Sequence, residues 1–142
     1  MKLIYIVIYF LIPLYSGEKS GAIEELQNLV TNCLQKYPVS DDELARFREL
    51  DKDPSLASDN YKCFGMCVVQ GRGWFIDDVL IDDAYIKFDA SGVLEEHVDE
   101  LYHIIKECKL LVGENKCDTV FQVGSCLEQK SWELLEKSVK SF

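Results

Sequence analysis

Cys63-Phe64-Gly65-Met66-Cys67 constrains the fold more than any other stretch, because it holds two of the six cysteines of this chain. One cysteine precedes this pentapeptide by 29 residues, the next follows it after 40, and the last two come after gaps of 8 and 8. An even number of cysteines behind an apolar leader predicts three disulfides formed in an oxidising compartment. Spacing alone leaves the pairing open among Cys33, Cys63, Cys67, Cys108, Cys117 and Cys126.

Helical geometry limits which cysteines can bond. On a helix, Cys63 and Cys67 lie one turn apart with their Cβ atoms ~5–6 Å from each other, whereas a disulfide needs ~3.8 Å. They should therefore bond to different partners. Cys117 and Cys126 are nine residues apart, which is about 180° around a helix. That helix should be held from opposite sides.

The first 16 residues predict a signal peptide. Lys2 supplies one positive charge, an apolar run extends from Leu3 to Leu14, and Ser16 is a small residue at which a peptidase could cut. A transmembrane helix needs ~20 apolar residues, and this run is shorter. We expect a secreted, extracellular protein with one domain over residues 17–142.

The composition is acidic, with a formal net charge of −10 at pH 7. Nucleic acids and anionic membrane surfaces both select for an excess of lysine and arginine. The charge therefore disfavours both as partners and suits an acidic extracellular carrier.

Apolar residues recur at helical spacing in the first half of the chain. Ser40, with Glu43 three residues later, matches a capping box and predicts a short charged helix through Leu50. A helix over residues 60–70 ends in the turn Gly71-Arg72-Gly73. Before them, a first helix that Pro38 closes has an apolar face made of Ile23, Leu26, Val30, Cys33, Leu34 and Tyr37.

The second half predicts further helices and no strand pair. Residues 74–88 fit a helix or an extended chain, and we assign them a short helix. Two helices are predicted over residues 116–129 and 131–142. The clearest periodicity predicts a helix that ends at Gly113, with a stripe of Leu94, Val98, Leu101, Tyr102, Ile105, Cys108 and Val112. An all-α domain of about six helices results.

The cysteine spacing, with Cys63-Phe-Gly-Met-Cys67 and Cys117-Asp-Thr-Val-Phe-Gln-Val-Gly-Ser-Cys126, resembles the insect odorant-binding proteins of the pheromone-binding and general odorant-binding family, six-cysteine type. The resemblance covers the whole mature chain. It implies that the first cysteine pairs with the third, the second with the fifth and the fourth with the sixth. The implied disulfides are Cys33–Cys67, Cys63–Cys117 and Cys108–Cys126, in agreement with the geometric limits.

The resemblance also implies a function. Similar proteins are compact bundles of about six helices, stapled by three interlocked disulfides around an internal hydrophobic cavity. We expect a secreted carrier that binds odorants or pheromones in that cavity and transports them to receptors. Its partners would be a small hydrophobic volatile ligand and a membrane odorant receptor, with the chain a monomer or weak homodimer. The alternatives are a ligand scavenger or carrier in saliva or reproductive fluid, and a protein-interaction module on the same fold.

Large apolar side chains near the cysteine helices are the candidates for ligand contact, although most apolar residues of an amphipathic helix belong to the core. Tyr85 and Tyr102 could each offer a hydroxyl to a ligand alcohol, aldehyde or ester. The predicted ligand-binding residues are Phe64, Met66, Trp74, Phe75, Tyr85, Phe88, Phe121 and Trp132.

Two features suggest regulation of ligand binding. His97 and His103 are the only side chains that ordinarily titrate between about pH 5 and 8, so pH-triggered release is one hypothesis and a solvated polar face is the alternative. The chain after Cys126 has 16 residues. They form either a lid over the cavity or a helix packed outside. The lid residues would be Trp132, Leu135, Val139 and Phe142.

Catalytic and metal-binding motifs do not account for this chain. Six cysteines pair completely and leave no nucleophilic thiol. Glu100-x-x-His103 is a single half of a di-iron motif, which needs two copies. The segment from Asp51 starts like a calcium loop but has Leu56 and Lys62 where glycine and glutamate belong. We therefore predict no enzyme activity, no metal and no cofactor.

Overall fold

The computed structural model describes residues 20–46, 53–89 and 94–140, and six α-helices account for most of them. The predicted all-α bundle of about six helices is thereby confirmed. The predicted signal peptide, residues 1–16, lies outside the described residues. Along the chain the elements are α2 (Ser20–Lys36), α3 (Asp41–Ala45), η2 (Pro54–Leu56), α5 (Asp59–Gly71), β1 (Phe75–Ile76), β2 (Val79–Leu80), α6 (Asp82–Asp89), η3 (Glu95–His97), α7 (Val98–Cys108) and α8 (Lys116–Lys140).

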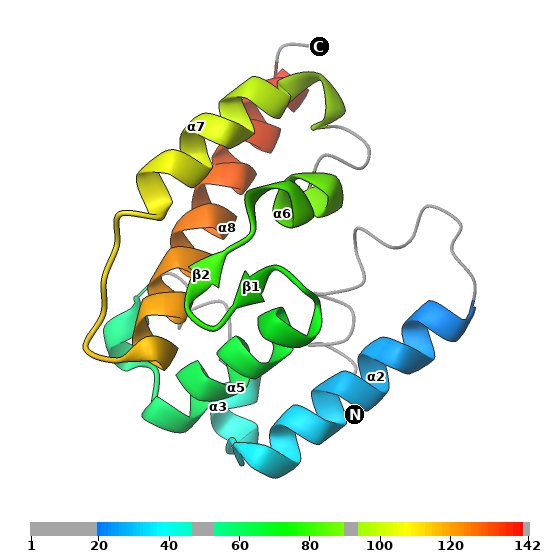
Figure 1. Cartoon of the computed structure of the whole chain (residues 1–142), viewed down its shortest axis with the longest axis vertical. Coiled ribbons are helices and arrows are strands. Elements are labelled where there is room, and N and C mark those ends of the chain that lie inside the picture. The colour runs from blue at the N-terminus through cyan, green and yellow to red at the C-terminus, as the bar shows by residue number, and fades with distance from the viewer. Residues whose placement is uncertain (1–19, 47–52, 90–93, 141–142) are drawn as a thin grey trace.

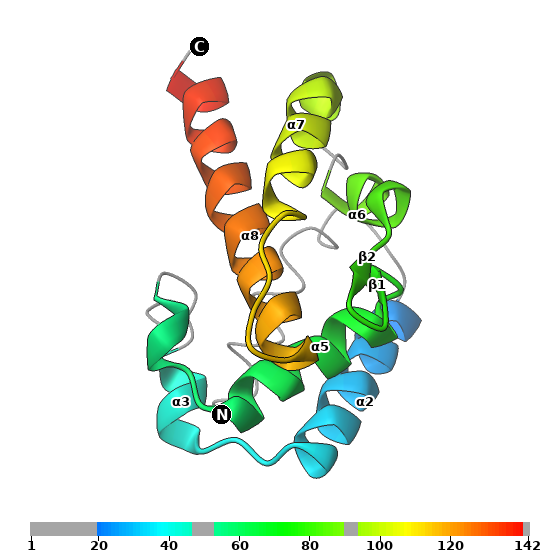
Figure 2. The ribbon, with the colours of Figure 1, turned by 60° about the vertical axis from the view of Figure 1, so that its left-hand side comes forward.

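The long helix α8 organises the bundle. It packs along α7 and, near its start, against α5, which crosses below it (Figures 1 and 2). Helix α2 lies against the other side of α5, the β-hairpin lies beside α5, and α6 lies beside α7. No helix among the described residues is long and apolar enough to cross a membrane.

Helix α2 confirms the first predicted helix. Leu26, Val30 and Cys33 of its apolar face are fully buried. Gly71 at the end of α5 lies against the Leu29 side chain, and a Cβ atom at position 71 would displace that side chain. The glycine therefore gives Leu29 room to pack between the two helices.

The predicted cap at Ser40 starts α3, but only half of the capping box forms. The Ser40 hydroxyl accepts a hydrogen bond from the Glu43 backbone N–H at 3.2 Å. The Glu43 carboxylate instead accepts the Ser58 backbone N–H at 3.0 Å and the Ser58 hydroxyl at 2.8 Å. Since Ser58 caps α5 through the Tyr61 N–H, these bonds tie the starts of α3 and α5 together. The remainder of the segment predicted through Leu50 lies outside the described residues.

The segment 74–88 contains a strand pair that the sequence did not predict. Strands β1 and β2 form an antiparallel hairpin with Phe75 opposite Leu80 and both side chains buried. The turn places Asp77 at a positive φ of 54°, and the Gln70 side chain donates to the Asp77 carbonyl at 2.8 Å. The hairpin therefore forms through tertiary contacts that no local periodicity reports. The expected short helix follows it as α6.

The helix predicted to end at Gly113 is shorter than expected at both ends. Leu94 is buried in a turn, residues 95–97 form the 3-10 helix η3, and α7 ends at Cys108. The last predicted stripe residue, Val112, is 81% exposed. Apolar residues after Cys108 continued the helical period, but the chain leaves the helix there to reach the start of α8.

The two helices predicted at the C-terminus are one continuous helix, α8. No glycine or proline interrupts the chain between residues 129 and 131, so nothing ends the helix there. The tail, for which the sequence left open a lid or a helix packed outside, continues straight beside α7 (Figure 2). Trp132 and Val139 are exposed, Leu135 is partly buried, and Phe142 lies outside the described residues.

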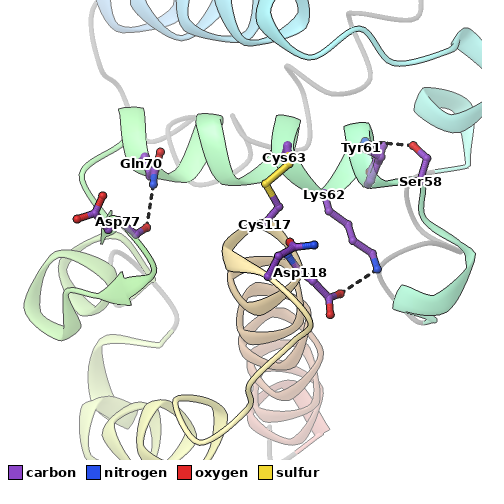
Figure 3. The surroundings of a disulfide bond; sticks show 9 residues. Ser58, Tyr61, Lys62, Cys63, Gln70, Asp77, Cys117 and Asp118 are labelled. Carbon is purple, nitrogen blue, oxygen red and sulfur yellow. Dashed lines mark hydrogen bonds and ion pairs between the residues drawn. A yellow bond between two sulfur atoms is a disulfide. The ribbon is translucent and has the colours of Figure 1, made fainter.

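The three disulfides have the pairing that the resemblance implied. Cys33–Cys67 links α2 to α5, Cys63–Cys117 links α5 to α8, and Cys108–Cys126 links α7 to α8. Two of these disulfides bond α8 to different neighbours, α5 and α7, as the spacing of Cys117 and Cys126 predicted. Figure 3 shows the α5–α8 bridge between Cys63 and Cys117.

Candidate ligand-binding site

The structure places six of the eight predicted ligand-binding residues in two apolar clusters. Phe64 and Phe121 are buried in the smaller cluster, between α2, α5 and the first turns of α8. Trp132 lies on α8 with 47% of its surface exposed, and the Phe88 side chain lies outside the described part of the chain. The larger cluster, formed by the hairpin, α6, α7 and α8, contains Phe75 and Tyr85, with Met66 and Trp74 packed against it.

A polar pair lies inside the larger cluster. The Tyr85 hydroxyl is 3.3 Å from the Ser131 hydroxyl, and both residues are only 7% exposed. The Trp74 ring packs edge-on against the Tyr85 ring with 5.9 Å between centroids. A buried hydroxyl pair beside aromatic rings can orient one oxygen of a ligand whose carbon chain enters the apolar cluster.

Ser131 was missed by sequence reasoning. The predicted helix over residues 131–142 begins at Ser131 and therefore gives this side chain no place in the core. In the continuous helix α8 it lies one turn after the buried Leu127, so its hydroxyl faces the core. Reading residues 116–140 as one helix would have shown this register.

The smaller cluster is closed by aromatic packing. The Tyr61 ring contacts the Phe121 ring edge-on at 5.7 Å and lies 6.3 Å from the Phe64 ring, centroid to centroid. These rings fill the space between α5 and α8 beside the Cys33–Cys67 and Cys63–Cys117 disulfides. The two predicted residues here thus stabilise the joint between the helices.

Glu128 is a titratable group that the sequence did not single out. It lies on α8, where burial raises the pKa of its carboxyl to about 7 and a hydrogen bond with Trp132 opposes the shift. A carboxyl with this pKa exchanges its proton near neutral pH. Among the described residues no three His, Cys, Asp or Glu side chains are close enough to bind a metal ion.

We predict that Glu128→Gln stabilises the protein at pH 8 and has little effect at pH 4.5. Because the folded pKa lies above the unfolded value, the wild type loses stability as pH rises from about 4.5 through about 7, whereas glutamine does not titrate. The expected gain at pH 8 is on the order of 1–3 kcal/mol. Urea unfolding at both pH values measures it, with Glu136→Gln on the exposed side of α8 as the control. An equal effect of Glu128→Gln at both pH values would contradict this assignment.

The two histidines have different surroundings. His97 is partly buried at the start of α7, where its Nδ1 lies 3.3 Å from a Glu100 carboxylate oxygen and its Nε2 lies 2.9 Å from the Ser138 hydroxyl of α8. His103 is exposed. Only His97 therefore joins α7 to the end of α8, and pH-dependent release stays a hypothesis that rests on this residue.

A groove of about 270 Å³ runs between α7 and α8. None of the eight predicted ligand-binding residues lines it. Charged and titratable side chains form most of its wall, which does not suit an uncharged apolar ligand. The lining residues are Glu100, His103, Ile104, Lys130, Glu133, Leu134 and Lys137.

Known proteins resemble this chain over most of its length. A model of the PBP/GOBP family matches residues 18–130. General odorant-binding protein 57c of Drosophila melanogaster is 27% identical over 138 residues, which cover 91% of this chain and 87% of the relative. General odorant-binding protein 56a of the same species is 26% identical over 96 residues, which cover 68% of this chain and 66% of the relative.

One solved structure has a similar fold. It is described as the fatty acid binding protein OBP56a from the oral disk of the blowfly Phormia regina. The superposition has a TM-score of 0.64 at 24% sequence identity and covers 82% of this chain and 97% of the other. At this identity the similarity establishes the arrangement of the helices.

Proposed function

This chain belongs to the PBP/GOBP family, and from that premise we propose that it is a secreted carrier that binds small hydrophobic ligands and transports them through aqueous fluid to membrane receptors. The signal peptide over residues 1–16 and the domain over residues 17–142 are part of this proposal. Members of the family are binding carriers, which agrees with the expectation that the chain is not an enzyme.

The observation that carries the proposal is the buried Tyr85–Ser131 hydroxyl pair inside the larger apolar cluster. Burying a polar group in apolar surroundings is unfavourable unless it is hydrogen-bonded. Here the two hydroxyls lie within hydrogen-bond distance of each other, and a hydroxyl can both donate to and accept from a ligand oxygen or hydroxyl. The site would thus take molecules with an apolar chain and one oxygen-bearing group.

The affinity for a ligand would come from burial of its carbon atoms, and the preference for oxygen-bearing ligands would come from the two hydroxyls. Burying ~250 Å² of ligand carbon contributes about 6 kcal/mol before ordering costs, which corresponds to affinities near micromolar at best. We propose Trp74, Phe75, Tyr85 and Met66 as the principal ligand contacts. Phe88 is proposed with them from the sequence, while Phe64, Phe121 and Trp132 are proposed as peripheral contacts.

We predict that Tyr85→Phe weakens the binding of oxygen-bearing ligands by about fivefold and leaves an alkane of equal length unaffected, because one hydrogen bond of ~1 kcal/mol is lost. The measurement is displacement of N-phenyl-1-naphthylamine by alcohols, aldehydes, esters, fatty acids and alkanes. Fatty acids are included because the solved relative is described as binding them. Tyr102→Phe is the matched control, since the Tyr102 hydroxyl donates to Asp83 on the surface at 3.0 Å.

Two results would count against this assignment. If the folded wild type takes up no fluorophore, the protein has no accessible apolar site and the carrier proposal fails. If Tyr102→Phe changes ligand preference as much as Tyr85→Phe does, the buried hydroxyl pair is not the orienting group, although the carrier proposal would survive.

A further inference from the structure

Three consecutive aliphatic residues are exposed in the connection between α7 and α8. Leu110 is 80% exposed, Val112 is 81% exposed, and Leu111 between them is 38% exposed. Figure 1 shows this connection, in yellow, at the outer left edge of the molecule. Adjacent exposed aliphatic side chains mark a surface that contacts something other than water.

The connection is held in a fixed conformation. The Leu110 N–H donates to the Glu107 carbonyl and the Leu111 N–H to the Cys108 carbonyl, at 3.2 and 3.1 Å. The Gly113 N–H donates to the Thr119 hydroxyl at 2.8 Å. A Cβ atom at Gly113 would lie 2.7 Å from the Asp118 backbone carbon, so this close approach needs glycine.

A disulfide also lies at each end of the connection between α7 and α8. Cys108 precedes it and is bonded to Cys126, and Cys117 follows it and is bonded to Cys63. The segment is thus tied to α5 and α8 at its ends and cannot fold inward to bury its aliphatic side chains. A surface that is fixed before contact loses little conformational entropy when it binds.

The local charge differs from that of the whole chain. Residues 106–116 contain three lysines and two glutamates, a net +1 (3 − 2), in a chain of net charge −10. Lys109 pairs with Asp82, and Glu107 pairs with Lys130. Lys106 and Lys116 are exposed and form no ion pair with another described residue. Their side chains can reach lipid phosphates while the aliphatic residues between them enter the acyl region.

We propose that Leu110, Leu111 and Val112 form a lipid-docking loop that inserts into a zwitterionic bilayer surface. The acidic remainder of the chain disfavours an anionic surface, whereas a phosphatidylcholine surface offers phosphates to the lysines without a net charge that repels the protein. Docking through this loop leaves the Tyr85–Ser131 site on other parts of the bundle. The inference does not rest on the proposed carrier function.

A protein partner fits the loop less well. Residues that dominate protein interfaces are mostly tryptophan, tyrosine and arginine, and leucine and valine are under-represented among them. Leu110, Leu111 and Val112 are all aliphatic, with Lys109 directly before them and Gly113, Glu114, Asn115 and Lys116 after them. That composition is typical of surfaces that enter lipid.

The test is flotation of the secreted, disulfide-bonded protein with phosphatidylcholine vesicles. The variant L110S/V112S should bind at least about tenfold more weakly, since two of the three inserting side chains are lost. The matched control is I76S/V79S, which removes two aliphatic side chains that are 66% and 56% exposed on the hairpin. This control should float like the wild type. Equal near-UV circular dichroism and equal fluorophore uptake in all three proteins show that fold and carrier site are intact.

A second variant reports the contact directly. Tryptophan at position 110, in L110W, should be quenched by brominated phosphatidylcholine, and tryptophan at position 76, in I76W, should not. The proposal fails if the wild type does not float, if I76S/V79S loses binding as L110S/V112S does, or if L110W is not quenched. It also fails if L110S/V112S abolishes self-association in analytical ultracentrifugation without lipid, because the loop would then be an interface between two copies.

Discussion

Replacing Cys63 and Cys117 together by alanine is expected to lower the free energy of unfolding by about 4 kcal/mol, because this disulfide closes the longest loop of the three. The two cysteines are 54 residues apart, against 34 and 18 for the other pairs. In the chain-entropy model, a longer closed loop removes more conformations from the unfolded state. The same bond joins α5 to α8, whose packing connects the two apolar clusters.

Urea unfolding followed by far-UV circular dichroism measures this loss, with C108A/C126A as the comparison. That shorter loop, of 18 residues, is expected to contribute about 3 kcal/mol. Cys108 is fully buried, so replacing it by alanine also leaves a small cavity. This cavity adds to the stability loss of C108A/C126A and brings it closer to that of C63A/C117A. A loss below about 1 kcal/mol in C63A/C117A would show that the disulfide does not act through the unfolded state.

A local signal predicted the start of α3. Ser40 and the first turn of α3 follow from a side-chain oxygen placed to accept a backbone N–H, which needs only residues close in sequence. The apolar stripe of α2 likewise identifies its buried face. The resemblance carried by the cysteine spacing contributed more, because it implied disulfides that join residues distant in sequence.

The errors lie where tertiary contacts override local pattern. Val112 continues the periodicity of α7, yet the chain leaves the helix after Cys108 because it must reach Cys117 beside α5. The β-hairpin depends on burial of Phe75 and Leu80 and on a Gln70 contact with the turn. These interactions join segments whose proximity the sequence pattern does not encode.

The candidate site residues lie in different surroundings. Trp74, Phe75 and Tyr85 do gather in one cluster, because large aromatic residues are usually buried. Trp132 does not, since its place on α8 turns it outward. Ser131 and Glu128 carry no local signal, and their importance depends on the surrounding burial.

No pattern in the sequence indicates the interactions that Asp118 makes. It follows Cys117 at the start of α8 and is buried. Its carboxylate accepts a hydrogen bond from the Lys62 ammonium at 2.8 Å (Figure 3). It also accepts the Glu114 N–H at 2.8 Å and the Gln122 side-chain amide at 3.0 Å. One carboxylate thus joins α5, the α7–α8 connection and α8 next to the Cys63–Cys117 disulfide.

We expect Asp118→Asn to lower the free energy of unfolding by about 3–5 kcal/mol at pH 7, because the Lys62 charge then remains mostly buried without its counter-ion. Asparagine keeps the size of the side chain, so the loss reports charge and hydrogen bonding. In K62M/D118N the charge is removed from both partners, and the double variant should recover part of the loss. If the effects of the two substitutions simply add, the ion pair does not couple them.

The direction of the pKa shift of Asp118 determines how the effect of Asp118→Asn on stability changes with pH. The hydrogen bond from Lys62, with that from the Glu114 N–H, lowers the pKa of Asp118 below its ordinary value, while burial alone would raise it. A lowered folded pKa means that the stabilisation is complete above the unfolded pKa and is lost as pH falls toward the folded one. The difference in unfolding free energy between wild type and Asp118→Asn should therefore be constant above about pH 5 and shrink below about pH 4.

Glu128 acts in the opposite direction, because its pKa is raised, and the effect of Glu128→Gln on stability is complete only above about pH 7. Unfolding curves of both variants between pH 3 and pH 8 separate the two groups, and a difference for Asp118→Asn that persists unchanged at pH 3 would show that its carboxylate charge is not what stabilises the fold.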